Sequence, residues 1–379
     1  MSRRLLTSLA SSSFVSERTE RPYQALNEIR SSEHDLTPHM LIHIIPFRQG
    51  IPRRNPNPAP TIPRRGAPPQ KSRIRGVKQI VVVASGKGGV GKSTVAANLA
   101  LSLLQTSTLS RPARIGLLDL DIFGPSVPKL MGLENAGDPE LSDENKLIPL
   151  QNHGVKTMSI GYLLRESCSH FPCLSTYTPN PENDTPVVWR GMMVMKAVQQ
   201  LLFDVDWTTK TGTTSGSSGT ESGSSDLDVL VIDMPPGTGD VQLSLGQLVA
   251  VDGAVIVSTP QDVALIDARK GVAMFNKVSI PMIGLLLNMS HFTCDSCTKP
   301  HELFGSSAKF EKAAMDLNLE VLGKIPLVPT ISDGGDAGRP VMVQSSGEGE
   351  EVRQSMRSVG EKVWEWLSGR ERADVGTRG

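Results

Sequence analysis

Cysteine is scarce in this chain of 379 residues, which contains only four. So few cysteines argue against a secreted fold built on disulfides. Long apolar runs are also missing, since no stretch reaches the roughly 18 residues that a membrane span requires. The remaining composition, with 38% hydrophobic residues and 35 glycines, is typical of a globular protein with a sizeable core. A chain of this length has room for one large α/β domain with extensions or for two smaller domains.

Acidic residues are absent from Leu36 to Leu118, although the net charge of the whole chain is zero. The front of this stretch is basic and contains Arg48, Arg53, Arg54, Arg64, Arg65, Lys71, Arg73, Arg75 and Lys78. Such an excess also occurs in nucleic-acid-binding arms, but here prolines separate the charges and no aromatic residues alternate with them. We therefore interpret the region as a tethering or targeting segment and expect no nucleic-acid partner.

The N-terminus has the composition of a mitochondrial transit peptide. Residues 1–16 contain two arginines and six serines, no acid, and three leucines on one helical face. A secretory signal would need an uninterrupted apolar segment, which this stretch lacks. Glutamates follow from residue 17 onward, so an ordinary disordered terminus is the alternative. We predict a presequence over residues 1–35, a Pro- and Arg-rich linker over 36–75, and a location in the mitochondrial matrix. The folded domain is expected at 76–345 and a C-terminal helix and tail at 346–379.

A glycine-rich segment lies at the centre of the predicted fold. Residues 79–104 read as an apolar strand, Ile80 to Ala84, then a glycine-rich turn and a strong helix former, Val95 to Leu104. The turn satisfies the phosphate-loop pattern G-x-x-x-x-G-K-[ST]. Its glycines let successive N–H groups turn toward one point, where the helix N-terminus adds positive potential. A glycine-rich turn with an incidental lysine is the alternative, which the flanking strand and helix disfavour.

This loop supplies most of the candidate nucleotide ligands. In the P-loop pattern the lysine, here Lys92, contacts the β- and γ-phosphates, and the hydroxyl of Ser93 binds Mg²⁺. The predicted phosphate-binding residues are Gly86, Lys87, Gly88, Gly89, Val90, Gly91, Lys92, Ser93 and Thr94. The segment therefore predicts a nucleotide-binding protein.

Two further apolar strands end in aspartates. Residues 114–119 lead into Asp119 and Asp121, and residues 228–233 end at Asp233, just before a Pro-Pro-Gly turn. Carboxylates at the carboxyl ends of parallel strands lie where open α/β sheets bind ligands. We predict that Asp121 orients a water molecule or a Mg²⁺-bound water, whereas capping of the next turn is the alternative for both residues. Asp233 matches the Walker B carboxylate that holds Mg²⁺, and the turn would bring the Gly237 amide toward the γ-phosphate.

Strand and helix patterns alternate along the rest of the chain. We expect strands at 156–160, 253–258, 281–287 and 319–325, and helices at 187–202, 264–276, 307–317 and 353–367. This alternation predicts an α/β fold of the P-loop NTPase class, with a mostly parallel, doubly wound sheet and helices on both faces. We expect the last helix to pack on the sheet rather than on a membrane, because its polar face carries both charge signs. Residues 210–226 should form a flexible insertion.

Several motifs resemble a known family. Lys87, in the segment GKGGVGKS, resembles the second lysine of the deviant Walker A ATPases, a group that includes MinD, ArsA and the nitrogenase iron protein. The motifs DLDIFGPS, DMPPGTGD and STPQ, which begin at Asp119, Asp233 and Ser258, resemble the Mrp branch of iron–sulfur carrier ATPases from about Gly76 to Gln344. Within that branch, the segment PVVWRGMMVM at residues 186–195 resembles the mitochondrial member required for assembly of respiratory complex I.

The resemblance implies a nucleotide-bound homodimer in which Lys87 reaches the phosphates of the partner chain. It implies ATP, with Asn288 near the adenine; the Asn-Lys-x-Asp motif expected of a GTPase is missing, because Met289 follows Asn288. It also implies slow ATP hydrolysis coupled to cluster transfer, through Lys87, Lys92, Asp121 and Asp233. The implied partners are upstream cluster donors and apo iron–sulfur proteins, complex I subunits among them.

Cys294 and Cys297 carry the chemistry that distinguishes this branch from other P-loop ATPases. A C-x-x-C loop offers two thiolates, whereas a [4Fe–4S] cluster or a structural zinc usually has four ligands. A symmetric dimer that pools both pairs would supply four, and the family is understood to bridge a labile cluster in this way. From the residues alone, the alternatives for this cysteine pair are a redox dithiol and a zinc site. We interpret Cys168 and Cys173 as incidental, because no partner His or Cys lies at a zinc-like spacing; a second cluster half-site is the alternative.

The hypothesis is an ATP-binding carrier that holds a [4Fe–4S] cluster between two chains and transfers it to apo-proteins. One rival is a positioning ATPase of the MinD/ParA kind that acts on a membrane or on DNA and needs no cysteines. A second rival is a nucleotide-gated scaffold that carries no metal.

Overall fold

The structure is a computed structural model, and it describes residues 71–106, 111–163, 191–208, 226–294, 296–345, 347 and 349–376. All of them belong to the unit Arg65–Gly379, one of the two units into which the chain divides. Outside the described residues lie the predicted presequence and nearly all of the predicted linker and insertion. Cys168 and Cys173 also lie outside them. Within the described part, Ser72 already bonds to the backbone at Leu248 and Ala250.

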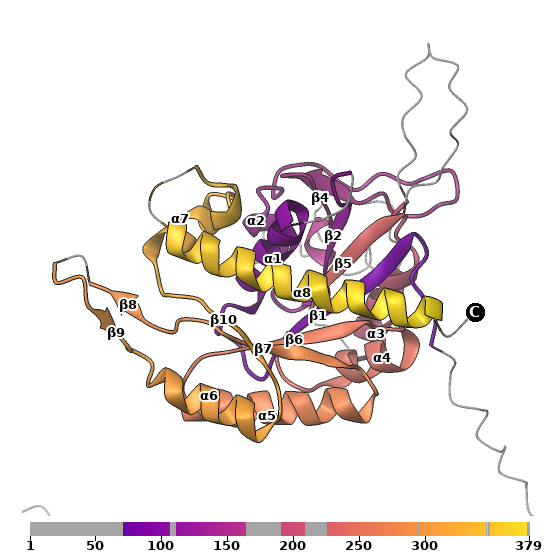
Figure 1. The fold of residues 1–379 in the computed structure, drawn as a ribbon. Helices are drawn as coiled ribbons and strands as arrows, with labels where there is room; N and C mark the ends of the chain where they lie inside the picture. Colours follow the sequence, from indigo (N-terminus) through magenta and orange to yellow (C-terminus); the bar gives the residue numbers. More distant parts are fainter. Residues whose placement is uncertain are drawn as a thin grey trace, which may run out of the picture. The chain divides into compact units, whose positions relative to one another are not determined.

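An eight-stranded sheet forms the centre of the unit (Figure 1). In spatial order its strands are β10 (Val321–Lys324), β7 (Met282–Leu287), β6 (Gly253–Ser258), β1 (Val77–Ser85), β5 (Leu227–Asp233), β2 (Ile115–Asp119), β4 (Val155–Ser159) and β3 (Leu150–Asn152). All neighbouring pairs are parallel except β3 with β4 at one edge. The predicted mostly parallel sheet is confirmed. Its central strands are buried on both faces, which is why they read as apolar runs.

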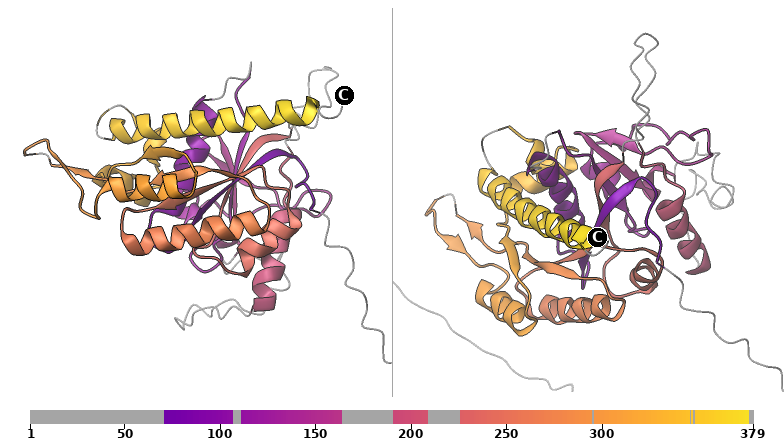
Figure 2. Two further views of the ribbon diagram at one scale, coloured as in Figure 1. Left: turned by 60° about the horizontal axis from the view of Figure 1, so that its bottom comes forward. Right: turned by 45° about the vertical axis from the view of Figure 1, so that its right-hand side comes forward.

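Helices cover both faces of this sheet, as predicted (Figure 2). One face carries α1 (Lys92–Thr106) and α8 (Glu350–Gly376), which pack against each other. The other face carries α4 (Asp240–Leu248), α5 (Asp262–Lys277) and α6 (Ser307–Asp316), and α3 (Gly191–Phe203) contacts α4 through Met195 and Ser244. The short helices α2 (Val127–Leu130) and α7 (Pro329–Asp336) pack together, and α2 also contacts α1; single 3-10 turns occupy Ile160–Tyr162 and Val341–Val343.

The last helix, α8, packs against the body of the unit. Met356, Val359 and Val363 on one face of α8 are fully buried, and the hydroxyl of Ser102 in α1 donates to the Met356 carbonyl at 2.7 Å. The helix begins and ends farther out than its apolar pattern predicted, because charged residues extend it at both ends. Among the described helices, none combines the length and the apolar character that a membrane crossing requires.

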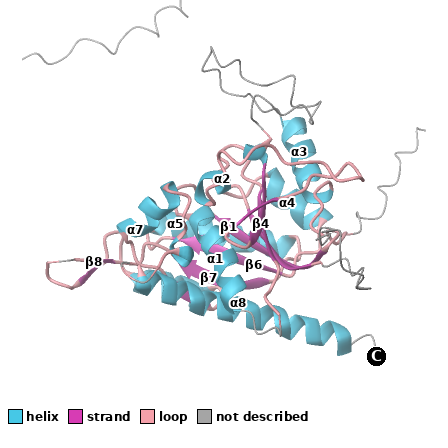
Figure 3. Cartoon of the chain, turned by 90° about the horizontal axis from the view of Figure 1, so that it is seen from above, coloured by secondary structure: helices cyan, strands magenta, loops and turns pink. Residues whose placement is uncertain are grey.

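Parallel pairing brings the functional strand ends to one edge of the sheet. β1, β2 and β5 are neighbours, and Asp233 is the pairing partner of both Val83 and Asp119. The loop after β1, the aspartates after β2 and β5, and Asn288 after β7 therefore start from the same edge. The two-stranded hairpin of β8 (Phe292–Thr293) and β9 (Pro300–His301) follows β7 and projects from the body of the unit (Figures 1 and 3).

Candidate nucleotide site and cysteine hairpin

The glycines of the phosphate loop are required by its backbone. Gly89 and Gly91 adopt φ values of +78° and +79°, in the left-handed region that favours glycine. A Cβ at Gly86 would overlap the backbone of Asp267 in α5, so the loop can approach that helix only with glycine there. The N–H of Val95 donates to the Gly91 carbonyl at 3.0 Å, and α1 begins at Lys92. The loop therefore leads directly into a helix N-terminus, as a phosphate site requires.

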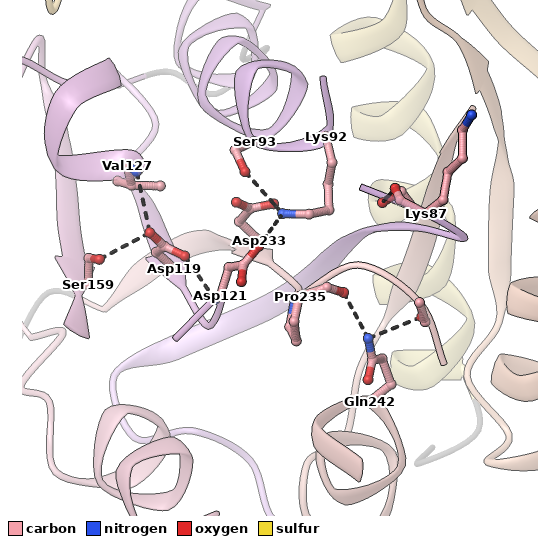
Figure 4. A network of polar contacts seen from close by, with 12 residues as sticks. Lys87, Lys92, Ser93, Asp119, Asp121, Val127, Ser159, Asp233, Pro235 and Gln242 are labelled. Carbon is pink, nitrogen blue, oxygen red and sulfur yellow. Dashed lines mark hydrogen bonds and ion pairs between the residues drawn. The ribbon is translucent and has the colours of Figure 1, made fainter. Parts of the chain in front are cut away.

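Lys92 lies at the centre of a buried charge network (Figure 4). Its ammonium donates to Asp233 Oδ1 at 2.5 Å and to Ser93 Oγ at 3.0 Å, and it lies 3.8 Å from Asp121 Oδ2. Lys92 is 6% exposed and Asp233 is fully buried. The structure thus brings together four of the predicted site residues, with one cation between two carboxylates.

The second oxygen of Asp233 is suited to a cation. Asp233 Oδ2 is buried and has no hydrogen-bond partner among the described residues. A buried carboxylate oxygen without a donor is costly, and a metal ion or its water shell removes that cost. Ser93 Oγ lies beside the same Lys92 ammonium. The donor set at this point, a carboxylate and a hydroxyl beside a phosphate loop, therefore fits Mg²⁺.

Asp119 has a structural role. Its carboxylate accepts hydrogen bonds from the Asp121 N–H at 2.9 Å, the Ser159 hydroxyl at 3.0 Å and the Val127 N–H at 3.3 Å. These bonds fix the loop after β2 and the start of α2, so the turn-capping alternative describes Asp119. Asp121 instead lies across from Lys92, with its side chain 13% exposed. The two aspartates have different contacts because the chain turns after β2, so that Asp119 faces the loop and Asp121 faces Lys92.

Burial, together with the negative charge of Asp233, raises the pKa of Asp119 to about 7. Burial also raises the pKa of Asp233, where the nearby Lys92 ammonium opposes the shift. An aspartate in an unfolded chain titrates near pH 4. Between about pH 4 and pH 7 the folded protein therefore binds more protons than the unfolded chain.

We expect Asp119 to make the free energy of unfolding fall as pH rises from about 4 to about 7. One proton of difference corresponds to at most about 1.4 kcal/mol per pH unit. In urea titrations at about pH 5 and pH 8, the Asp119→Asn variant should show a smaller loss between the two pH values than the unmodified protein. The exposed Asp336 provides the control, because Asp336→Asn should keep the original pH dependence. An unchanged pH dependence in Asp119→Asn would contradict this assignment.

The switch turn is bonded to β1, and the second loop lysine is bonded to the residue that precedes α5. The Gly237 N–H donates to the Ser85 carbonyl at 2.9 Å, and Gln242 Nε2 donates to the carbonyls of Pro235 at 2.8 Å and Gly237 at 3.1 Å. Gly237 therefore has its amide bonded to β1, and this bond must break before the amide can turn to a phosphate. Lys87 is half-buried and donates to Gln261 Oε1 at 2.9 Å within its own chain.

Asn288 connects the end of β7 to the phosphate loop. Its side-chain amide donates to the Val90 carbonyl at 2.8 Å, and its N–H donates to the Ser258 carbonyl at 2.8 Å. Beside it lies a cavity of about 330 Å³. Its lining includes Gly91, Thr94, Asn288 and Met289, residues between Ile325 and Asp336, and Val352 and Met356 of α8. The cavity adjoins the phosphate loop, and sequence reasoning missed the part of its wall that α7 and α8 form.

The cysteine pair lies on the β8–β9 hairpin. Cys294 is half-buried and Cys297 is exposed. The Thr298 N–H donates to the Cys294 carbonyl at 2.7 Å, and the Cys294 N–H donates to the Lys299 carbonyl at 3.1 Å, so the turn is tied at both ends. The two thiol sulfurs and a ring nitrogen of His301 all lie within 4.8 Å of one another. Sequence reasoning missed His301, although its position four residues after Cys297 is a spacing at which a third metal ligand can occur.

Comparisons with known proteins agree with these features. The model of a family described as the NUBPL iron-transfer P-loop NTPases matches residues 76–212 and 218–364. The chain belongs to this family. It is 46% identical over 286 residues to the iron–sulfur cluster transfer protein NUBPL of Mus musculus, covering 76% of this chain and 77% of that protein. It is 45% identical over 275 residues to the Arabidopsis thaliana iron–sulfur protein required for NADH dehydrogenase, mitochondrial, covering 73% and 75%.

Among solved structures, the chain is similar to a nucleotide-binding protein from Archaeoglobus fulgidus in complex with ADP and with Co. The two superpose with a TM-score of 0.52 at 31% identity, and the match covers 70% of this chain and 89% of that one. The chain is also 42% identical over 270 residues to the iron–sulfur cluster carrier protein of Escherichia coli, covering 71% of this chain and 62% of that protein. The predicted family of iron–sulfur carriers and the P-loop NTPase fold are therefore confirmed. Membership in a carrier family favours the carrier hypothesis over a positioning ATPase.

Proposed function

We propose that this chain binds ATP with Mg²⁺ and carries a [4Fe–4S] cluster between Cys294 and Cys297 of two identical chains, and that it delivers the cluster to apo-proteins. The observation that carries the proposal is the direct connection between the two sites. Asn288 bonds to the phosphate loop and lines the cavity beside it, and only five residues separate it from Cys294.

The nucleotide half of the proposal rests on the buried network around Lys92. The loop amides and the start of α1 would hold the phosphates, and Ser93 and Asp233 would hold Mg²⁺, which supplies charge neutralisation for the phosphates. Lys92 would then pair with phosphate oxygens, and Asp121 is placed to orient water. Because Lys87 bonds to Gln261 in its own chain, we propose that it leaves this partner when it reaches across to the other chain of the homodimer.

The cysteine half rests on the exposure and number of the thiols. One hairpin offers two cysteines, and a four-iron cluster has one open position on each iron, so two hairpins match the cluster as cargo. Cys297 is exposed and the hairpin projects from the unit (Figure 3), which suits delivery to another protein.

The coupling between the two halves would pass through residues 288–294. Met289 lines the cavity and has a positive φ of 54°, an unfavourable conformation for a long side chain. Immediately after it, the Ser290 N–H bonds to the Ile325 carbonyl at 2.9 Å, and the His291 carbonyl accepts from the Leu327 N–H at 2.7 Å. A nucleotide that moves Asn288 or Met289 would thereby shift the base of the cysteine hairpin, and slow hydrolysis would reset it.

We propose complex I subunits as recipients and the mitochondrial matrix as the location. Support comes from the Arabidopsis thaliana relative, whose name ties it to NADH dehydrogenase and to mitochondria, and from the acid-poor, Arg- and Ser-rich N-terminus. We propose upstream cluster donors as the further partners, from which the chain receives its cluster.

Anaerobic reconstitution of the full chain with iron and sulfide tests the proposal. We expect about four iron and four sulfide per dimer, and faster release to an apo [4Fe–4S] acceptor with Mg-ATP than without it. Iron and sulfide analysis, size-exclusion chromatography and acceptor activity measure these quantities. A chain that takes up no iron, yet dimerises with ATP and then binds vesicles or DNA, would instead support a positioning ATPase.

A further inference from the structure

We propose that Cys294, Cys297 and His301 of a single chain form a mononuclear metal site for a thiophilic divalent cation such as Zn²⁺, with His301 as its third ligand. This site goes beyond the cluster-carrying function and does not depend on a second chain. The three ligand atoms already lie within 4.8 Å of one another on one hairpin.

The distance between Cys297 and His301 fits direct coordination. Cys297 Sγ lies 3.7 Å from His301 Nε2. With Zn–S near 2.3 Å and Zn–N near 2.0–2.1 Å, a tetrahedral angle at the metal places the sulfur and the nitrogen about 3.6 Å apart. This pair can therefore bind one ion without a change in the hairpin backbone.

The hairpin itself fixes the relative positions of the ligands. His301 is paired with Phe292 and Pro300 with Thr293, so His301 is held two residues from Cys294 across the strands. The turn between them is closed by the hydrogen bonds of Thr298 and Lys299 to Cys294, with Thr298 at a positive φ of 55°. These backbone bonds hold both cysteines and His301 on one short hairpin, where their ligand atoms lie within 4.8 Å of one another.

The charge and protonation balance favour a divalent cation. Binding replaces the two thiol protons by the metal, and the two protons leave to solvent; the neutral imidazole donates through its unprotonated nitrogen. Two thiolates neutralise the charge of the ion, and no electron is transferred. Cys297 and His301 are exposed, so an ion can enter from solvent, and three protein ligands leave the fourth position of the metal open.

The imidazole distinguishes this site from the proposed cluster site. Four thiolates from two chains satisfy all four irons of a [4Fe–4S] cluster, so neither His301 has a vacant iron to bind. His301 therefore contributes to the single-ion form of the hairpin alone. As a consequence, loss of His301 should weaken the binding of one divalent ion while cluster reconstitution continues.

Anaerobic titration of the full chain with Co²⁺ tests the site, because tetrahedral thiolate-bound cobalt has characteristic visible absorption. We expect one Co²⁺ per chain at every protein concentration, displaced by Zn²⁺. His301→Asn should lower the Co²⁺ affinity more than about 100-fold, beyond the 10–100-fold that loss of a partner outside the coordination shell costs. His153→Asn is the matched control: His153 lies away from the hairpin with φ 52°, which asparagine tolerates, and the affinity should stay unchanged.

Three results would overturn the proposal: one Co²⁺ per two chains, a Co²⁺ affinity in His301→Asn within 100-fold of the original, or zinc X-ray absorption that shows sulfur ligands without imidazole. Failure of cluster reconstitution alone would leave one Co²⁺ per chain intact and would therefore bear only on the carrier function. Retained cluster loading in His301→Asn together with lost Co²⁺ binding would support both assignments.

Discussion

A Cys297→Ala variant of the full chain is expected to lose the reconstituted cluster while it keeps ATP binding. Each chain would retain one thiolate, so a dimer would offer two of the four ligands that a [4Fe–4S] cluster requires. Cys297 is exposed at the tip of a hairpin, and its truncation should not disturb the core. Iron and sulfide per dimer, the thiolate-to-iron absorption and the Kd for ATP are the quantities to measure. We expect iron near zero and an unchanged Kd.

Ser296→Ala is the matched control for this variant, since Ser296 is exposed in the same turn and is no ligand in the proposal. It should load iron like the unmodified chain. Cys294→Ala should behave like Cys297→Ala, because both thiols of each pair are needed. If either cysteine variant kept a full complement of iron, the cluster would have to be held elsewhere in the chain.

Lys92→Ala is expected to lower ATP affinity at least about 100-fold and also to destabilise the protein without nucleotide. The first effect follows because hydrogen bonds to charged groups contribute about 1.5–3 kcal/mol each, and the ammonium can reach more than one phosphate oxygen. The second follows because removal of Lys92 leaves the fully buried Asp233 without its cation. Breaking a buried pair costs about 3–5 kcal/mol, less whatever protonation of Asp233 recovers. Calorimetric ATP titration and urea unfolding measure the two effects.

A Lys87→Ala variant distinguishes the role of Lys87 from that of Lys92. Lys87 is half-buried and its partner is the neutral Gln261, so its loss should leave the free energy of unfolding within about 0.5 kcal/mol. Iron loading of the cysteines should persist in both lysine variants, because no thiol is changed, whereas ATP-dependent release to an acceptor should be impaired. Full ATP-dependent release by Lys92→Ala would contradict a role for the nucleotide in transfer.

Most of the sheet was predictable from sequence because its strands are buried on both faces. Residues 80–84, 114–119 and 228–233 are apolar runs, and the predicted strands agree with β1, β2 and β5 within a few residues. The short elements were missed. β3 and the β8–β9 hairpin have only two or three residues each and are largely exposed, so neither length nor apolar periodicity marks them.

The sequence by itself determined the phosphate loop, the aspartates after the strands and the cysteine pair, because each depends on spacing within one short segment. The tertiary structure decided what depends on distant segments. It paired Lys92 with Asp233, 141 residues away, and it joined Asn288 to the loop at Val90, 198 residues away. The turn after β2 places Asp119 where it accepts the hydrogen bonds that hold the loop, and it places Asp121 opposite Lys92. The tertiary structure also brought His301 to the two thiols, because strand pairing in the hairpin, and no periodicity along the chain, sets which side chains meet there.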